Sequence, residues 1–287
     1  EFNLSTDLTF TNAITGTGIF NKKGNATLTL SGNHGTFGGT TIIDAGKIIH
    51  RKNSASDTYF GGTTTINTGG TLEYALSTGE TLTGTINGGG NFIKSGNAEL
   101  IITGNNSGFT GTTTITGGIV TFNKNNATDK YFGGSTIING GTTLNYNINV
   151  SDTLPSRISG SGTFNKTGTA TLTLSGNNSN FTGTTVIDGG KITFNKTANT
   201  EYFGGTTTIN AGGELQYITT TSDKINGTIN GSGTLRKQGT ATLTLTGNNS
   251  GFSGITYLEE GIIEFEKTAQ NTYLSGITAV SYTHLRA

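Results

Sequence analysis

The stretch Lys166-Thr-Gly-Thr-Ala-Thr-Leu-Thr-Leu174 decides the fold class, because near copies of it return at a fixed spacing. The other copies begin at Lys22, Lys94 and Lys237, so the residue numbers of successive copies differ by 72, 72 and 71. A fixed period is the sequence signature of repeat architectures. The sequence therefore predicts a single repeat domain over residues 1–279. Its four repeats are predicted at 14–85, 86–157, 158–228 and 229–279, the last of them incomplete.

Apolar and hydroxyl side chains alternate within the quoted stretch. Ala170, Leu172 and Leu174 fall on one face of an extended chain and the intervening threonines on the other, which predicts a half-buried strand. Gly-Gly and Asn-Gly steps close such segments, because glycine permits the backbone angles of sharp corners. The leucines predicted for the core are Leu28, Leu30, Leu172, Leu174, Leu243 and Leu245.

A shorter unit, Phe-x-Gly-x-Thr, recurs twice in each complete repeat, and apolar positions at Ile86, Ile158 and Ile229 supply a third unit, so the sub-period averages about 24 residues. Its phenylalanines are Phe37, Phe60, Phe109, Phe132, Phe181, Phe203 and Phe252. Their regular register favours an internal aromatic stack over a platform for sugars or bases. We therefore expect these side chains in the core.

A single coil of this length cannot bury its apolar face alone, whereas stacked coils can, with each strand pairing to its counterpart in the next coil. The sequence therefore predicts an all-β fold, a right-handed parallel β-helix or solenoid, with about 24 residues per coil and three coils per repeat. A β-propeller would have repeats of about 40 to 50 residues, and a β-sandwich would not repeat so regularly.

Composition excludes several classes of protein. The chain has 47 glycines and no cysteine, and its 17 basic residues balance 17 acidic ones. Glycine is a poor helix former, the missing cysteines exclude disulfides and thiolate sites, and zero net charge gives no field to gather nucleic acid. No apolar run approaches the roughly 18 residues that span a bilayer. We expect neither nucleic-acid binding nor membrane insertion by this chain.

Both ends of the sequence suggest a fragment. The chain begins at Glu1 without a methionine or a signal peptide. The final octapeptide, Val280-Ser-Tyr-Thr-His-Leu-Arg-Ala287, matches one reading frame of a sequencing-library adapter. We expect residues 280–287 not to be native and leave them out of the fold prediction.

A family resemblance rests on two stretches of the third repeat. Gly162-Thr-Phe-Asn-Lys-Thr-Gly-Thr-Ala-Thr-Leu-Thr-Leu-Ser-Gly-Asn-Asn178, continued by Phe181-Thr-Gly-Thr-Thr-Val-Ile-Asp-Gly-Gly-Lys-Ile192, resembles the passenger-associated transport repeat (the autotransporter-associated β-strand repeat) of bacterial autotransporters. The likeness recurs in all four repeats, although Glu99 and Ile101 interrupt the threonine pattern of the second. It implies a pectin-lyase-like β-helical passenger domain, exported by type V secretion from a Gram-negative cell and displayed on or released from its surface. It also implies a translocator barrel in the outer membrane, beyond this sequence.

Catalysis on a β-helix would need clustered carboxylates with basic partners. Asp44 and Asp188 occupy equivalent slots, but Thr116 and Glu259 fill that slot in the other repeats. His34 and His50 each occur in one repeat only, which is typical of isolated exposed histidines without a catalytic or ligand role. The glycine strings lack the Asp of calcium-binding nonapeptides. We therefore expect no enzyme, no metal and no cofactor, with a polysaccharide lyase or hydrolase as the alternative.

The remaining prediction is a non-catalytic passenger that acts as a stalk or adhesin scaffold. Three variable segments, 53–58, 125–130 and 196–201, are predicted to form binding loops along one side of the rod. Their candidate contact residues are Asn53, Asp57, Asn125, Asp129, Lys130, Lys196 and Glu201. The expected partners are a receptor or glycan on a host or bacterial surface, or a second copy of the chain. Ice binding by a threonine face is a further alternative.

Overall fold

The computed structural model describes residues 1–196, 202–266 and 274–280, and this part of the chain consists of β-strands, turns and loops without a helix. Every strand pairing given below is parallel. The predicted all-β solenoid is confirmed, with about 13 turns in total. The chain divides into two compact units, Glu1–Asn145 and Tyr146–Ala287, each of which is described by itself.

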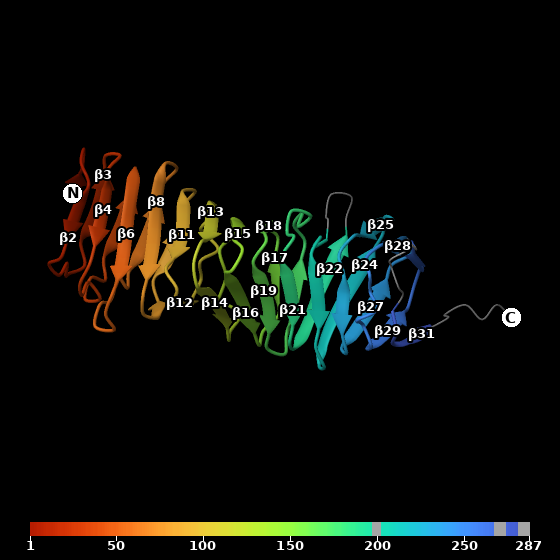
Figure 1. Cartoon of the computed structure of the whole chain (residues 1–287). Helices are drawn as coiled ribbons and strands as arrows, with labels where there is room; N and C mark the ends of the chain where they lie inside the picture. The colour runs from red at the N-terminus through yellow and green to blue at the C-terminus, as the bar shows by residue number, and fades with distance from the viewer. Residues whose placement is uncertain (197–201, 267–273, 281–287) are drawn as a thin grey trace. The chain divides into compact units, whose positions relative to one another are not determined.

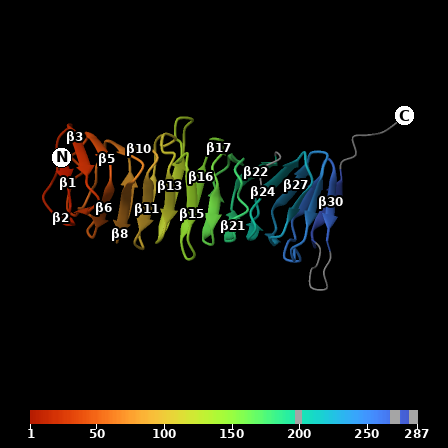
Figure 2. The ribbon, with the colours of Figure 1, turned by 90° about the horizontal axis from the view of Figure 1, so that it is seen from above.

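Unit 1 contains three ladders, in which each strand pairs with its counterpart one turn away along the chain; β6, β8, β11 and β13 lie side by side in both views (Figures 1 and 2). The first ladder contains β1 (Phe2–Asn3), β3 (Ile19–Lys23), β5 (Thr40–Ile43), β7 (Thr63–Ile66) and β10 (Thr85–Asn87). The second contains β2 (Leu8–Phe10), β4 (Thr27–Leu30), β6 (Gly46–Lys52), β8 (Gly70–Leu76), β11 (Asn91–Ser95), β13 (Thr112–Ile115) and β15 (Ser135–Ile138). The third contains β9 (Glu80–Leu82), β12 (Glu99–Ile102) and β14 (Ile119–Lys124).

Unit 2 follows the same plan after β16 (Thr143–Ile148), in which the unit boundary falls. Besides β18 (Ile158–Gly160), its strands lie in three ladders. One contains β19 (Thr163–Thr167), β21 (Thr184–Ile187), β23 (Thr206–Ile209) and β26 (Ile229–Gly231). The next contains β17 (Asp152–Leu154), β20 (Thr171–Leu174), β22 (Gly190–Lys196), β24 (Gly213–Thr219), β27 (Thr234–Gln238), β29 (Ile255–Leu258) and β31 (Ile277–Val280). The last contains β25 (Asp223–Ile225), β28 (Thr242–Leu245) and β30 (Ile262–Phe265).

The core of each unit is made by the inward-facing residues of these ladders. All seven phenylalanines and all six leucines that the sequence predicts inside are exposed by 4% or less. The phenylalanines contact one another in pairs, with ring centroids 4.8 Å apart for Phe37 and Phe60 and 5.2 Å apart for Phe109 and Phe132. Burial of such rings on successive turns joins each coil to its neighbours.

Most turns are shorter than the coil of about 24 residues that three coils per repeat would require. In the strand register, the step from Leu8 to Leu28 is among the shortest and the step from Gly46 to Gly70 is among the longest. The predicted coil length therefore equals the longest of these steps and exceeds most of them. The prediction overestimates the turn because it divides each repeat into three turns, whereas the strand register places more than three turns in a repeat.

The sequence repeat does not contain a whole number of turns. Three ladder steps from Phe20 end at Ile86. The sequence equivalent of Phe20 is Phe92, six positions beyond Ile86, and it pairs with Leu72 in the second ladder instead of continuing the first. In unit 2, three steps from Phe164 end at Ile229. The equivalent of Phe164 is Leu235, again six positions further on, and it pairs with Leu215 in another ladder.

Each repeat is therefore three turns and about one third, where the sequence predicted three. The six extra positions carry the chain across one additional side of the coil, so equivalent strands of successive repeats fall in successive ladders. The strand-free connections shift with them: 31–39 and 53–62 lead from the second ladder to the first, but 103–111 and 125–134 lead from the third ladder to the second.

Candidate functional site

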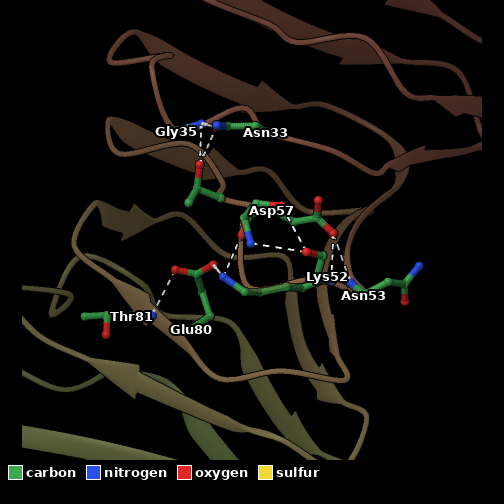
Figure 3. A network of polar contacts seen from close by, with 10 residues as sticks. Asn33, Gly35, Lys52, Asn53, Asp57, Glu80 and Thr81 are labelled. Carbon is green, nitrogen blue, oxygen red and sulfur yellow. Dashed lines mark hydrogen bonds and ion pairs between the residues drawn. The ribbon is translucent and has the colours of Figure 1, made fainter.

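The first predicted binding loop is closed by its own residues (Figure 3). The Asp57 carboxylate accepts hydrogen bonds from the backbone N–H of Asn53 at 3.1 Å and of Ser54 at 3.0 Å. Beneath the loop, the Lys52 ammonium donates to the Asp57 carbonyl at 2.5 Å and pairs with Glu80 at 2.7 Å. Asn53 and Asp57 thus hold the loop in shape, while the side chains at its tip, 54–56, are exposed.

The second loop repeats this arrangement. The Asp129 carboxylate accepts from the backbone N–H of Asn125 at 3.1 Å and of Asn126 at 3.2 Å, and the Lys124 ammonium donates to the Asp129 carbonyl. Lys130 joins the loop to the preceding turn through its backbone, which donates to the Gly104 carbonyl at 2.8 Å. The exposed tip is formed by residues 126–128.

The two loops do not line one side of the solenoid, so that part of the prediction is wrong. The first lies between the second and first ladders, and the second lies between the third and second ladders. The extra third of a turn per repeat causes this shift. Of the third predicted loop, Lys196 ends β22, and Glu201 lies outside the described residues.

Each repeat has a buried lysine at one corner, two residues after an inward phenylalanine or leucine. The four are Lys22, Lys94, Lys166 and Lys237, each with 0% exposure. The Lys94 ammonium donates to the carbonyls of Ser95 at 2.8 Å, Gly96 at 2.9 Å and, one turn on, Gly117 at 3.0 Å. Gly96 has φ +75°, and a Cβ there would lie 2.2 Å from the Leu76 carbonyl, so the corner requires glycine.

The other three lysines make equivalent bonds. Lys22 and Lys166 donate to the two carbonyls that follow them in the chain and to one carbonyl on the next turn. Lys237 does the same. Burial lowers the pKa of Lys94, Lys166 and Lys237 to about 8, with Glu260 opposing this shift at Lys237. At neutral pH these three lysines therefore remain mostly charged, with three N–H donors each for three carbonyls.

The four lysine corners lie inside segments that match a known protein family. A profile of the passenger-associated-transport-repeat family matches residues 20–48, 92–122, 164–194 and 235–264. Each match contains one of the buried lysines and the apolar strand that follows it. The chain carries four passenger-associated-transport repeats.

A curated autotransporter protein is similar to part of this chain. The adhesin BmaC autotransporter of Brucella suis biovar 1 (strain 1330) is 31% identical over 146 residues. The alignment covers 40% of this chain and 4% of that protein, so the chain corresponds to a small part of its relative. No solved structure matches the chain.

A second buried polar position joins successive turns of the passenger-associated-transport repeats. The Asn106 amide oxygen accepts from the Ile86 N–H at 2.8 Å, and Asn178 and Asn249 accept from Ile158 and Ile229 at 2.8 and 2.7 Å. In the first repeat, His34 Nδ1 takes this role and accepts from the Ile14 N–H at 3.2 Å. A side chain with an acceptor is needed because the N–H is buried.

The expectation that His34 and His50 are exposed is wrong: they are 0% and 1% exposed. His50 fills an aromatic position of the core, since it pairs with Leu30 as Phe122 pairs with Ile102 in the next repeat. The sequence contains this signal, because Phe122 follows His50 by one repeat period and Asn106 follows His34 by the same period.

The carboxylates considered for a catalytic alternative are engaged with neighbours in the ladders. Asp44 accepts from the Asn67 amide at 2.7 Å, and Glu259 binds Arg236 and Gln238. Arg236 also pairs with Glu214 at 3.0 Å, in a surface network for which the sequence motifs carry no signal. Within the described residues, no group of three or more histidines and carboxylates is arranged to hold a metal ion.

The threonine rows considered for ice binding do not form one array within either unit. Thr27 and Thr29 lie on β4 in the second ladder, whereas their equivalents Glu99 and Ile101 lie on β12 in the third. Thr171-x-Thr173 and its equivalent in β28 also lie in different ladders.

In the described ranges, no helix is long and apolar enough to cross a membrane.

Proposed function

We propose that this chain is a non-catalytic part of an autotransporter-type passenger, a β-solenoid scaffold that carries adhesive loops. The four passenger-associated-transport repeats and the adhesin relative both indicate the cell surface or the extracellular space as its location. The partner would be a receptor or glycan on a host or bacterial cell, or a second copy of the chain.

The loop architecture carries the proposal. In both described loops, a buried lysine and an aspartate bind the backbone, and the tips at 54–56 and 126–128 remain exposed with small, mostly polar side chains. A loop that is already ordered loses less conformational entropy on binding than a mobile one. This favours recognition of a partner over a role as spacer alone.

A catalytic role receives less support. Asp44 and Glu259, the carboxylates that the sequence offers, are bound to side chains of adjacent turns. They serve the ladder as hydrogen-bond and ion-pair partners. The separated threonine rows likewise speak against binding to an extended crystal face.

The test is adhesion of cells that display the protein. We expect Ala55→Arg combined with Ala127→Arg to reduce adhesion at least about tenfold, because each arginine adds bulk to a tip while the backbone bonds of the loop remain. Thr68→Arg, at an exposed turn, is the matched control. Display level and thermal melting are measured in parallel. Adhesion that survives the double substitution at equal display would reject the loops as contact sites.

A further inference from the structure

At two equivalent buried positions, the first repeat has a histidine where the second has an amide or an aromatic side chain. His34 stands where the second repeat has Asn106, and His50 stands where it has Phe122. Both positions face an equivalent tyrosine: the ring centroids of His50 and Tyr59 are 4.4 Å apart, and those of Phe122 and Tyr131 are 5.5 Å apart. Only the first repeat has imidazole rings at these two positions.

The imidazole of His50 is enclosed by aromatic rings. Its centroid lies 5.0 Å from that of Tyr74 and 5.2 Å from that of Phe60, in addition to the Tyr59 contact. Within the described part of the chain, His50 Nδ1, His34 Nε2 and the Tyr59 hydroxyl are buried without a hydrogen-bond partner. A neutral imidazole is tolerated in such a place, but an imidazolium has no partner for its second N–H.

The charged groups around the pair do not neutralise an imidazolium at His50. Connection 31–39 contributes His34 itself, connection 53–62 contributes Asp57 and Tyr59, and β8 contributes Tyr74. Glu80 and Lys52 form an ion pair with each other at 2.7 Å, and Arg51 on the same strand adds positive charge.

Both histidines resist protonation in the folded chain. Burial, and secondly the neighbouring His34, lower the pKa of His50 to about 3. Burial also lowers the pKa of His34, against the opposing effects of the Ser31 carbonyl and Asp57. An opened chain would bind protons near pH 6.5, so the stability of the closed state is complete above that pH and is lost as pH falls toward the folded pKa.

We propose that the His34 and His50 pair makes the first repeat open in acid while the second repeat stays closed. Opening frees the turns around residues 31–62, including the first adhesive loop. This acid-dependent opening does not depend on which partner the loops bind. It occurs wherever the protein meets an acidic solution.

The experiment is hydrogen exchange on the full chain at pH 7 and pH 5, corrected for the intrinsic exchange rate. At pH 5 most carboxylates remain ionised, so histidines dominate the change. For an opening that exposes His50, protection of β6 and β8 should fall about thirtyfold relative to β14, the second-repeat counterpart of β6.

The matched variant is His34→Asn with His50→Phe, which gives the first repeat the residues of the second. It should remove the acid-dependent loss and keep the exchange pattern at pH 7. His50→Phe alone should remove most of the loss. Equal acid sensitivity of both repeats, or an acid response that persists in the double variant, would overturn the proposal. Adhesion is not measured, so failure here leaves the loop proposal intact.

Discussion

The first and second repeats of unit 1 share the lysine that binds the corner carbonyls, keep a side-chain acceptor for one backbone N–H although His34 replaces the amide, and differ more on their surfaces. Lys22 and Lys94 hold corners with the same three bonds, although the longest is 3.3 Å in the first repeat and 3.0 Å in the second. On the outward face, Lys47 pairs with Glu73 at 2.9 Å in the first repeat, whereas an exposed isoleucine, Ile119, takes the place of Lys47 in the second. The solenoid therefore constrains the positions that bind the corner carbonyls and the inner N–H groups, and it leaves the outer face free to change.

Removal of a corner lysine should have the largest effect. Lys94→Met keeps the length of the side chain but removes the ammonium donor from three corner carbonyls, so we expect a loss of about 3 kcal/mol in the free energy of unfolding. Lys22→Met should cost somewhat less, because its third bond is longer. Denaturant unfolding measures both, with Lys23→Met at the more exposed neighbour as control. A corner variant as stable as this control would contradict the assigned role.

The amide position should rank second. Asn106→Ala removes the acceptor for Ile86 N–H and the donor to the Thr103 carbonyl, which predicts a loss of about 2 kcal/mol. His34→Asn in the first repeat should change stability by less than about 0.5 kcal/mol at pH 7, because it restores the residue type of the other repeats. Thermal melts of the two variants compare the repeats directly, and equal losses in both would contradict the equivalence of His34 and Asn106.

The surface ion pair should matter least. Burial raises the pKa of Glu73, but the hydrogen bonds from Ser95 and Lys47 and the charges of Lys47 and Arg51 outweigh it, so the net pKa is lowered. The pair therefore stabilises above the ordinary glutamate pKa, and this contribution is lost in acid. Glu73→Gln should cost about 0.5 kcal/mol at neutral pH and less in high salt. Unfolding at two salt concentrations tests this, and a loss above about 2 kcal/mol, the size expected for a buried group left without its partner, would place Glu73 among the constrained positions.

The sequence predicts the class of fold because the alternation of apolar and hydroxyl side chains and the spacing of the repeats are both visible in the residues. Leu172 and Leu174 define an inward face, and the spacing of the Lys166 motif defines the repeat. The number of turns per repeat does not follow in the same way. It depends on which strands pair, and the pairing of Phe92 with Leu72 is set by how many residues each corner consumes.

The polar interior is harder to predict for a physical reason. A lysine between two threonine-rich strands is ordinarily a solvated residue, and only its position two residues after an inward phenylalanine places it in the core. His50 is misleading in the sequence because its neighbours along the chain are mostly polar, whereas its neighbours in the fold, Tyr59 and Tyr74, are aromatic. The sequence draws attention to Asp57 and Asp129, but their carboxylates bind their own loops.

Because each repeat contains an extra third of a turn, the number of repeats that precede a feature decides on which side of the solenoid that feature lies. Loss or duplication of one repeat within a unit would turn every feature beyond it by about a third of a revolution around the solenoid axis, and would move those features along the axis by three to four strand spacings. Three repeats added together would restore the original orientation. Recombination between such similar segments would therefore move a loop to a different side of the solenoid without changing any residue in that loop.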